Sequence, residues 1–472
     1  MPPIDGYRAQ SSSSPRWRAA ALAELLAALE RGGIAYCLLG QVDSYPDSIP
    51  SDVDFMVHPT DLPRIAGVIE EVAGRIDARV VQRLRHEIGA EYFVLAAFVD
   101  ARAVFVEFDV CGDYRRRTRL WLPAATVLGS RERDRRGYWV PAAPMALLYY
   151  LIKRIDKRSL GTDHLDYLRR TYARDPEGAA VLLRQYLGER LSPSFEALLA
   201  ESNPPPTAAA LGRLAADLAR AMPRERWVSR LRALHNELNR IVLRVLRPTG
   251  LVIGVLGADG SGKSTLIEHL IDEVKPAFRG HAYFHLRPTV LLRRSAAAAA
   301  SAIAPHDQVA RSRAASLVKL GLLVFEYTAG WWLRIRPLII RSTFVVFDRY
   351  LHDMIADPKR YRWAGGTGAI RAAAAWVPQP QLWLVLDAPV ETLQARKQEV
   401  SAEASAMQRA AYLELAKRLR RCTVISTAGT VAEATEKAAA AVLDALALRH
   451  GHADRDRSGG AAVAPTGTPA SR

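Results

Sequence analysis

The sequence has 472 residues, of which 49% are hydrophobic, and it carries a formal net charge of +16. This length exceeds what one hydrophobic core normally holds, so two or three domains are expected, and the apolar content is ample for real cores. The basic excess suggests an anionic partner such as a nucleotide or an acidic membrane. Nucleic acid is disfavoured, because much of the arginine is scattered along helices, as at Arg213, Arg220 and Arg224.

Cysteine usage and the N-terminus indicate where the protein resides. Cys37, Cys111 and Cys422 lie far apart, in or beside apolar runs where a small buried side chain is the default role. Residues 1–18, expected to be flexible, lack the charged segment, apolar core and cleavage site of a secretory signal. A cytoplasmic location is therefore expected.

Residues 19–187 mix helices with short alternating runs, which predicts an α+β domain. Asp52 and Asp54 lie on one side of a predicted strand, because alternate residues of a strand share a face. Glu107 and Asp109 share a face of a later strand. Neighbouring carboxylates repel one another unless a divalent cation binds between them. The pattern therefore predicts a metal site at Asp52, Asp54 and Asp109.

About residues 33–170 resemble the nucleotidyltransferase superfamily, in which a Gly turn precedes Asp-x-Asp and a third acid completes a two-metal site. Here the turn is Gly40, but Gln41 stands where the family usually has Gly or Ser. The segment from Lys157 to Asp166 is similar to the family's later Lys-Asp-x-x-Asp segment. The resemblance implies nucleotidyl transfer. A surface acidic hairpin, or a fold that kept its acids without activity, stays an alternative.

Residues 188–248 are almost all helix-forming, apart from the prolines at 204–206 and at 223, and are interpreted as a helical connector. Strands and helices then alternate over residues 249–448, with strands predicted at 251–256, 343–347, 382–386 and 423–425. This order predicts an α/β fold built on a parallel sheet with crossover helices. The tail, 449–472, is rich in small and charged residues and is expected to be disordered.

The first of these strands leads into residues 257–265, Gly-Ala-Asp-Gly-Ser-Gly-Lys-Ser-Thr, which match the phosphate-binding P-loop pattern. Its glycines let backbone N–H groups converge on phosphates, Lys263 reaches the outer phosphates and Ser264 offers its hydroxyl to Mg²⁺. A helix is predicted from Ser264 onwards, so the loop lies at a positive helix end. The nucleotide-binding residues expected here are Gly257, Asp259, Gly260, Ser261, Gly262, Lys263, Ser264 and Thr265.

Residues 317–340 form the most membrane-like segment, but Lys319, Glu326, Arg334 and Arg336 interrupt it, which disfavours a membrane span. A buried helix is expected. Surface association through the Trp331–Trp332 and Arg-bearing end is the minority alternative.

A second nucleotide-site motif, Asp348-Arg349-Tyr350, ends the strand predicted at 343–347. A carboxylate there lies where Mg²⁺ and a transferring phosphate meet, although it could also be a helix cap. With the P-loop, the strand 380–389 and a later basic helix, this motif makes about residues 250–446 resemble the thymidylate kinase family.

That resemblance implies an ATP-dependent, Mg²⁺-assisted kinase whose default acceptor is thymidylate. Lys263 would hold ATP phosphates, Ser264 and Asp348 would organise the metal, and Arg349 would bind the acceptor phosphate beside Tyr350. Arg396 and Lys397 correspond to the mobile lid, although they could equally be an exposed helix face. Residues 426–430 are similar to the loop that lines adenine in the family.

The acceptor region departs from the family, because 285–289 read His-Leu-Arg-Pro-Thr where Arg-Glu-Pro-Gly is usual. Arg287 is still expected to meet the acceptor, which is either a nucleotide or another phosphorylated or hydroxylated small molecule. Two other functions stay open: an ATP-binding switch or adaptor in glycan or membrane metabolism, and metal-dependent nucleotidyl transfer by the N-terminal domain. Homodimer formation and peripheral membrane contact are compatible with the sequence.

Overall fold

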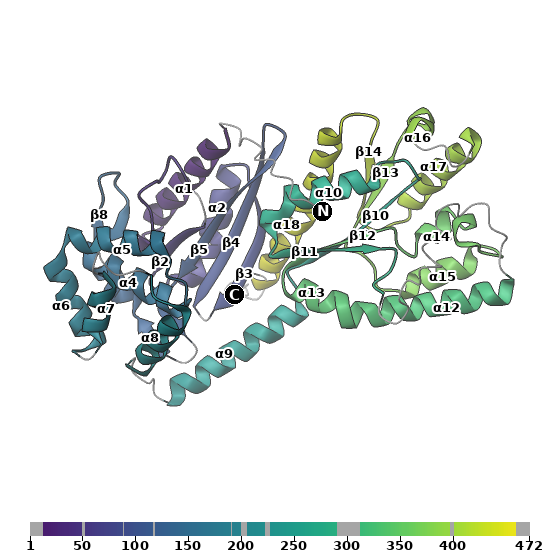
Figure 1. Ribbon diagram of the computed structural model, residues 1–472. Helices are drawn as coiled ribbons and strands as arrows, with labels where there is room; N and C mark the ends of the chain where they lie inside the picture. The colour runs from purple at the N-terminus through teal and green to yellow at the C-terminus, as the bar shows by residue number, and fades with distance from the viewer. Residues whose placement is uncertain are drawn as a thin grey trace, which may run out of the picture. The chain divides into compact units, whose positions relative to one another are not determined.

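The computed structural model describes residues 13–49, 52–87, 89–116, 119–189, 191–199, 205–221, 227–289, 312–396 and 401–458. The chain forms two compact units, residues 1–95 with 105–242 and residues 96–104 with 243–472. Figure 1 traces both. Within the described residues, no helix combines the length and hydropathy that crossing a membrane requires.

The sheet of the first unit has the strand order β1-β2-β5-β4-β3, with β2 parallel to β5 and antiparallel to β1. Its elements are α1 (Ser13–Arg31), β1 (Tyr36–Leu38), β2 (Val53–Val57), α2 (Ile65–Arg75), β3 (Arg79–Glu87), β4 (Ala90–Val99) and β5 (Arg102–Cys111). The register places Asp54 of β2 beside Asp109 of β5. The topology thus brings together two of the predicted metal-binding acids.

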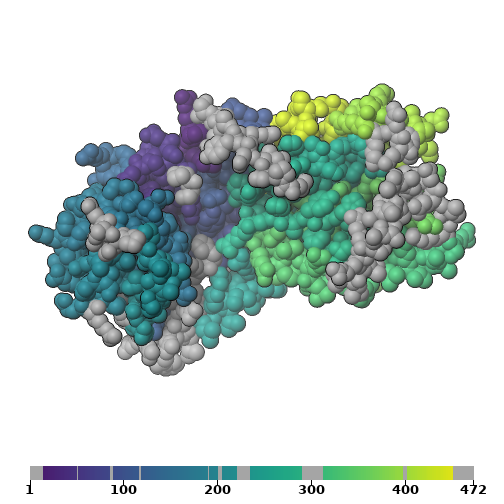
Figure 2. Space-filling model, viewed as in Figure 1, coloured from purple at the N-terminus to yellow at the C-terminus, as the bar shows by residue number. Residues whose placement is uncertain are grey.

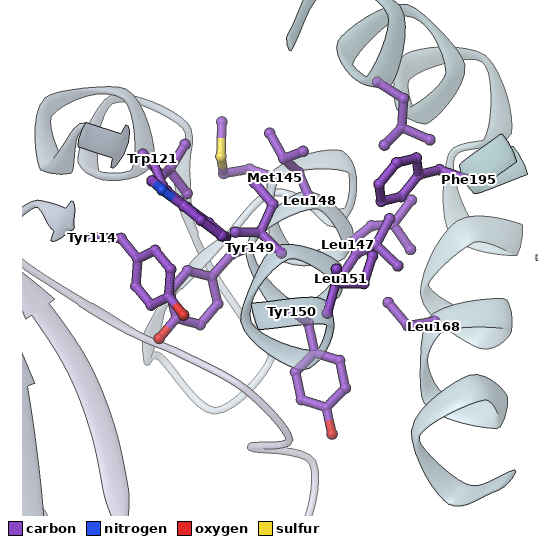
Figure 3. Packing of buried hydrophobic residues seen from close by; sticks show 14 of the residues in the cluster. Tyr114, Trp121, Met145, Leu147, Leu148, Tyr149, Tyr150, Leu151, Leu168 and Phe195 are labelled. Atoms are coloured by element: carbon purple, nitrogen blue, oxygen red, sulfur yellow. The ribbon is translucent and has the colours of Figure 1, made fainter. Parts of the chain in front are cut away.

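Helices complete the first unit and share one core. They are α3 (Ala124–Gly129), α4 (Ala143–Asp156), α5 (Thr162–Arg174), α6 (Pro176–Leu187), α7 (Ser192–Leu199) and α8 (Ala208–Ala221), with short hairpins β6–β7 (Tyr114–Arg116, Arg119–Leu122) and β8–β9 (Arg131–Arg133, Trp139–Pro141). Figure 3 shows Phe195 of α7 packed near Leu151 and Leu168. The predicted connector segment therefore contributes buried side chains to this core, and it continues into α9 (Trp227–Leu246).

The second unit contains a five-stranded sheet in the order β11-β12-β10-β13-β14, whose neighbouring strands are all parallel. The α/β class and the parallel sheet predicted from the sequence are confirmed. The elements are β10 (Leu251–Gly257), α10 (Lys263–Val274), β11 (Gly280–His285), α12 (Arg313–Gly330), a π-helical turn (Trp331–Ile335), α13 (Arg336–Ile340), β12 (Thr343–Asp348), α14 (Asp353–Ala356), α15 (Gly368–Trp376), β13 (Leu382–Asp387), α16 (Val390–Arg396), α17 (Ala402–Ala416), β14 (Cys422–Ser426) and α18 (Val431–Ser458).

The central strands β10 and β12 are buried along their whole length, because crossover helices cover both faces of a parallel sheet. Gly254 of β10 lies against Trp383 of β13, and a Cβ at this glycine would come 2.6 Å from the indole ring. The carboxyl ends of parallel strands share one edge of the sheet, so the segments that follow β10 and β12 lie together.

Some expectations for the chain ends and one helix need correction. Residues 13–18 and 449–458 belong to α1 and α18, so the described parts of the predicted flexible ends are helical, and the rest lie outside the described residues. The segment 317–340 is helical as expected but only one face is buried. Leu320 and Tyr327 lie in the core, whereas Phe325 and Trp332 are exposed.

Candidate active site

The P-loop between β10 and α10 has the backbone that its glycines permit. Gly257, Gly260 and Gly262 have φ values of +153°, +80° and +85°, which other residues rarely adopt. A Cβ at Gly257 would lie 2.8 Å from the Ser261 hydroxyl oxygen. The sequence of the loop therefore matches its shape, and the loop ends at the N-terminus of α10, where the helix dipole favours an anion.

Lys263, the first residue of α10, folds back against the loop. Its Nζ donates to the carbonyl oxygens of Gly257 at 3.0 Å and Ala258 at 2.8 Å. Burial, together with the nearby charge of Arg349, lowers the pKa of Lys263 to about 7. An incoming phosphate would add negative charge beside this buried amine and favour its charged form.

Three residues with hydroxyl groups, Ser261, Ser264 and Thr265, are close to the lysine in the sequence. Ser264 and Thr265 are exposed at the start of α10, whereas Ser261 is buried. Among the described residues, the Ser261 Oγ atom has no hydrogen-bond partner. A buried polar atom without a partner is costly, so a ligand in the loop would satisfy it.

Asp348 ends β12, the strand next to β10, and its carboxylate is only partly satisfied. The Tyr283 hydroxyl donates to Oδ2 at 2.9 Å, and the His285 Nδ1 atom lies 3.4 Å from the same oxygen. Within the described part of the chain, the buried Oδ1 atom has no partner. Burial opposes ionisation, but hydrogen bonds from His285 and Tyr283 outweigh it and lower the pKa of Asp348. The site thus holds an ionised carboxylate with one buried oxygen that has no partner among the described residues.

Arg349 is buried in a network of hydrogen bonds and ion pairs rather than open to solvent. It contacts the Asp259 carboxylate in the P-loop, and it donates to Asp353 at 2.7 Å and to the Tyr412 hydroxyl at 3.2 Å. The predicted acceptor-binding guanidinium therefore already binds two carboxylates. Its contact with Asp259 nevertheless places it beside the phosphate loop.

The network includes residues that the sequence did not single out. Asp353 is fully buried and accepts from the hydroxyls of Tyr361 at 2.7 Å and Tyr412 at 2.8 Å. Arg360 contacts Asp259. Burial opposes ionisation of Asp259, but Arg349 and Arg360 outweigh it and lower its pKa. The i, i+4 spacing of Arg349 and Asp353 is a local signal; for Tyr412, far along the chain, no signal exists.

The other predicted residues fall in different places. Arg396 is exposed at the end of α16, donates to the Thr427 carbonyl at 3.4 Å and approaches Gly262 of the loop. Arg287 is half-buried on the turn after β11. Tyr350 is a core residue: its ring packs against Tyr327 and its hydroxyl donates to the Pro378 carbonyl, so it is not available to a substrate. Lys397 lies outside the described residues.

The first unit brings together the acids predicted for its metal site. One carboxylate oxygen from each of Asp52, Asp54 and Asp109 lies within 4.8 Å of the others. Sequence reasoning missed Lys153 of α4, whose Nζ is 2.7 Å from both oxygens of Asp54. Burial opposes the charged amine, but Asp54 outweighs it and raises the pKa of Lys153. Lys157, predicted as part of this site, is the residue just after α4, and Glu107 interacts with Tyr92.

Comparison with known proteins relates part of the chain to thymidylate kinases. No family model matches the chain. A thymidylate kinase of Xanthomonas campestris pv. campestris (strain B100) is 32% identical over 158 residues, which cover 32% of this chain and 62% of the relative. One of Xanthomonas oryzae pv. oryzae (strain PXO99A) is 30% identical over 153 residues, with the same coverage. The chain thus spans 62% of the length of the curated relatives that it matches.

A solved thymidylate kinase from Ehrlichia chaffeensis is 17% identical, with a TM-score of 0.27, over 38% of this chain and 89% of the other. At that TM-score the likeness adds nothing to the sequence similarity.

Proposed function

We propose that the second unit is an ATP-dependent kinase that transfers a phosphoryl group to a small phosphorylated acceptor, by default thymidylate. The observation that carries this proposal is the P-loop of residues 257–265, with the Lys263 amine buried beneath it and the Asp348 carboxylate on the next strand. The similarity to thymidylate kinases supports the reaction class.

The residues of the loop bind and orient ATP. Backbone N–H groups and the α10 N-terminus meet the phosphates, and the Lys263 amine leaves the carbonyls of Gly257 and Ala258 to reach them. Arg396, near Gly262, adds positive charge beside the loop. Catalysis then depends mostly on position and electrostatics.

The donor atoms of Ser264 and Asp348 fit a magnesium ion. The cation prefers oxygen ligands, and Asp348 offers an ionised carboxylate whose buried Oδ1 atom has no partner in the described part of the chain. When bound, magnesium supplies charge neutralisation of the transferring phosphate. Tyr283 and His285 hold the Asp348 carboxylate in place through its other oxygen.

The acceptor is proposed to lie on the side of the loop where Arg349 and Arg287 are found. Arg349 is buried and held in one orientation by Asp259 and Asp353, so an acceptor phosphate binds its guanidinium only by replacing one of these carboxylates. Arg287, on the turn after β11, is the second candidate for the acceptor's anionic group.

The test is turnover of ATP with Mg²⁺ by the purified full chain against thymidylate and a panel of other nucleoside monophosphates. We expect a nucleoside diphosphate product that is lost in Lys263→Ala and kept in Lys275→Ala, an exposed lysine after the same helix. Equal turnover by Lys263→Ala would refute the assignment. ATP binding without any product would favour the ATP-binding switch instead.

The first unit supports a second candidate function, metal-dependent nucleotidyl transfer. The favouring observation is the convergence of Asp52, Asp54 and Asp109, a carboxylate set suited to Mg²⁺ or Mn²⁺. Lys153 neutralises part of the charge, which leaves two negative charges for one divalent cation. Pyrophosphate release that vanishes in Asp52→Ala but survives in Lys263→Ala would establish this activity; its absence from the parent protein would exclude it.

A further inference from the structure

The P-loop contains a carboxylate, that of Asp259, within a segment whose glycines and lysine suit phosphate. This side chain is only 16% exposed, and its Oδ1 atom lies 4.0 Å from the Lys263 amine. A phosphate bound to that amine would lie roughly 7 Å or less from the carboxylate, because a charged amine and its oxygen partner are about 3 Å apart. Like charges this close repel one another strongly where the protein partly excludes water. The loop therefore needs a cation that neutralises Asp259.

Arg349 alone does not supply enough positive charge. One of its terminal nitrogens contacts Asp259, and the other donates to Asp353 at 2.7 Å. Asp353 is fully buried, and its remaining hydrogen bonds come from two tyrosine hydroxyls, which carry no charge. Among the described residues, Arg349 is the one cation in an ion pair with Asp353. A single guanidinium thus serves two carboxylates, and one negative charge is left.

Arg360 supplies the second cation. Its guanidinium contacts the Oδ2 atom of Asp259, whereas Arg349 contacts Oδ1. Arg360 is half-buried on a short 3-10 turn, Lys359–Tyr361, and its one ion pair within the described part of the chain is with Asp259. Each oxygen of the Asp259 carboxylate therefore has a guanidinium of its own, and the charges of the two arginines balance those of the two acids.

The turn that carries Arg360 is fixed by contacts outside the P-loop. The Arg360 N–H group donates to Asp357 Oδ1 at 3.2 Å, and Gln408 of α17 donates to the other oxygen of Asp357 at 3.1 Å. The Tyr361 hydroxyl donates to Asp353 of α14 at 2.7 Å. Figure 1 shows α14 and α17 near each other in the second unit, and Figure 2 shows teal and green side chains of this unit packed against one another. The position of Arg360 thus does not depend on a bound nucleotide.

We propose that Arg360 is a positioning residue for nucleotide binding, which neutralises the P-loop carboxylate and keeps it out of hydrogen-bond distance of the Lys263 amine. Without Arg360, the nearest cation that serves no other carboxylate is Lys263. Asp259 would then attract the amine that ATP needs and repel the ATP phosphates. This inference rests on the proposed binding of ATP at the P-loop, and it assigns Arg360 no contact with ATP.

Direct binding of a phosphate by Arg360 is the competing interpretation. The two interpretations differ in whether the effect of Arg360 depends on Asp259. A residue that acts through the carboxylate loses its effect once the carboxylate is removed, whereas a residue that binds phosphate keeps it. A double-mutant cycle measures this difference.

The experiment is isothermal titration calorimetry of the full chain with Mg²⁺ and adenylyl-imidodiphosphate, an ATP analogue that is not hydrolysed. Arg360→Gln should weaken binding about tenfold, the effect of one uncompensated charge near the phosphates. In the Asp259→Asn background the same change should weaken binding by less than about twofold. Arg360→Lys keeps the positive charge and should retain the affinity within about threefold. Lys359→Gln removes a charge at an exposed position of the same turn; it is the matched control and should bind like the parent.

Thermal unfolding checks that each variant is folded. Arg360→Met, which keeps most of the side-chain length without the charge, takes the place of Arg360→Gln if the latter does not fold. The proposal is overturned if Arg360→Gln binds the analogue as well as Lys359→Gln does. It is also overturned if the loss is equally large in the Asp259→Asn background, which would mean direct phosphate binding, or if Asp259→Asn binds no analogue, because the carboxylate would then be required. A parent that binds no analogue would refute the proposed function as well.

Discussion

Replacing the buried His352 should remove an acid sensitivity from the second unit. His352 is 7% exposed, packs against the rings of Tyr350 and Trp383, and has no partner for its Nδ1 atom among the described residues. Burial lowers the pKa of His352 to about 4 from an ordinary value of 6.5. The folded chain therefore resists a proton that the unfolded chain accepts.

The sign and size of the effect follow from linkage. Above pH 6.5 the imidazole is neutral in both the folded and the unfolded chain, so His352 costs the fold no stability there. As the pH falls from about 6.5 to about 4, only the unfolded chain binds the proton, and the free energy of unfolding decreases. The shift corresponds to about 3 kcal/mol in total, of which about 2 kcal/mol is lost by pH 5. His352→Phe keeps an aromatic ring against the same neighbours and cannot be protonated.

The assay is native-state hydrogen exchange of the β13 amides at pH 7.5 and pH 5, because it reports the opening free energy of this unit alone. Between the two pH values, the parent should lose about 2 kcal/mol more than His352→Phe. His281→Phe, a change at an exposed histidine of the same unit, should retain the parent's pH response. If His352→Phe loses as much stability on acidification as the parent, the assigned burial cost is refuted.

Three further changes test the packing of each unit. Asp353→Ala leaves Arg349 without its buried partner and should cost about 3–5 kcal/mol in urea unfolding, whereas a loss below about 1 kcal/mol would mean that the network is dispensable. Gly254→Ala should cost about 1–3 kcal/mol, measured as a lower Tm, because the new methyl group meets the Trp383 ring; an unchanged Tm would contradict that contact. Lys153→Met leaves the three carboxylates of the first unit unneutralised, so thermal unfolding should become more sensitive to added Mn²⁺ than in the parent, and an equal response would argue against a cation site.

The sequence predicted the local features of the second unit well. The P-loop is a continuous motif whose glycines dictate its own backbone, and the apolar runs around it are long enough to be recognised as buried strands. The position of Asp348 followed from the same logic, because it ends such a run.

Features that depend on distant parts of the chain could not be predicted in the same way. Tyr412 and Asp353 are 59 residues apart in the sequence, and Lys153 and Asp54 are 99 residues apart. The sequence around each residue therefore gives no signal that predicts the contact. The prediction of a buried helix at 317–340 was incomplete for a different reason. It is apolar nearly all round, so its periodicity does not tell which face is buried.

The two hydrogen bonds of Lys263 to its own loop bear on which anions the loop selects. Because the amine donates to two carbonyl oxygens of the loop, an anion that binds it must replace those two hydrogen bonds. A single small anion must break both hydrogen bonds for one new contact, whereas a polyphosphate replaces them with many at once. The loop thus favours ligands with several phosphates over ligands with a single anionic group.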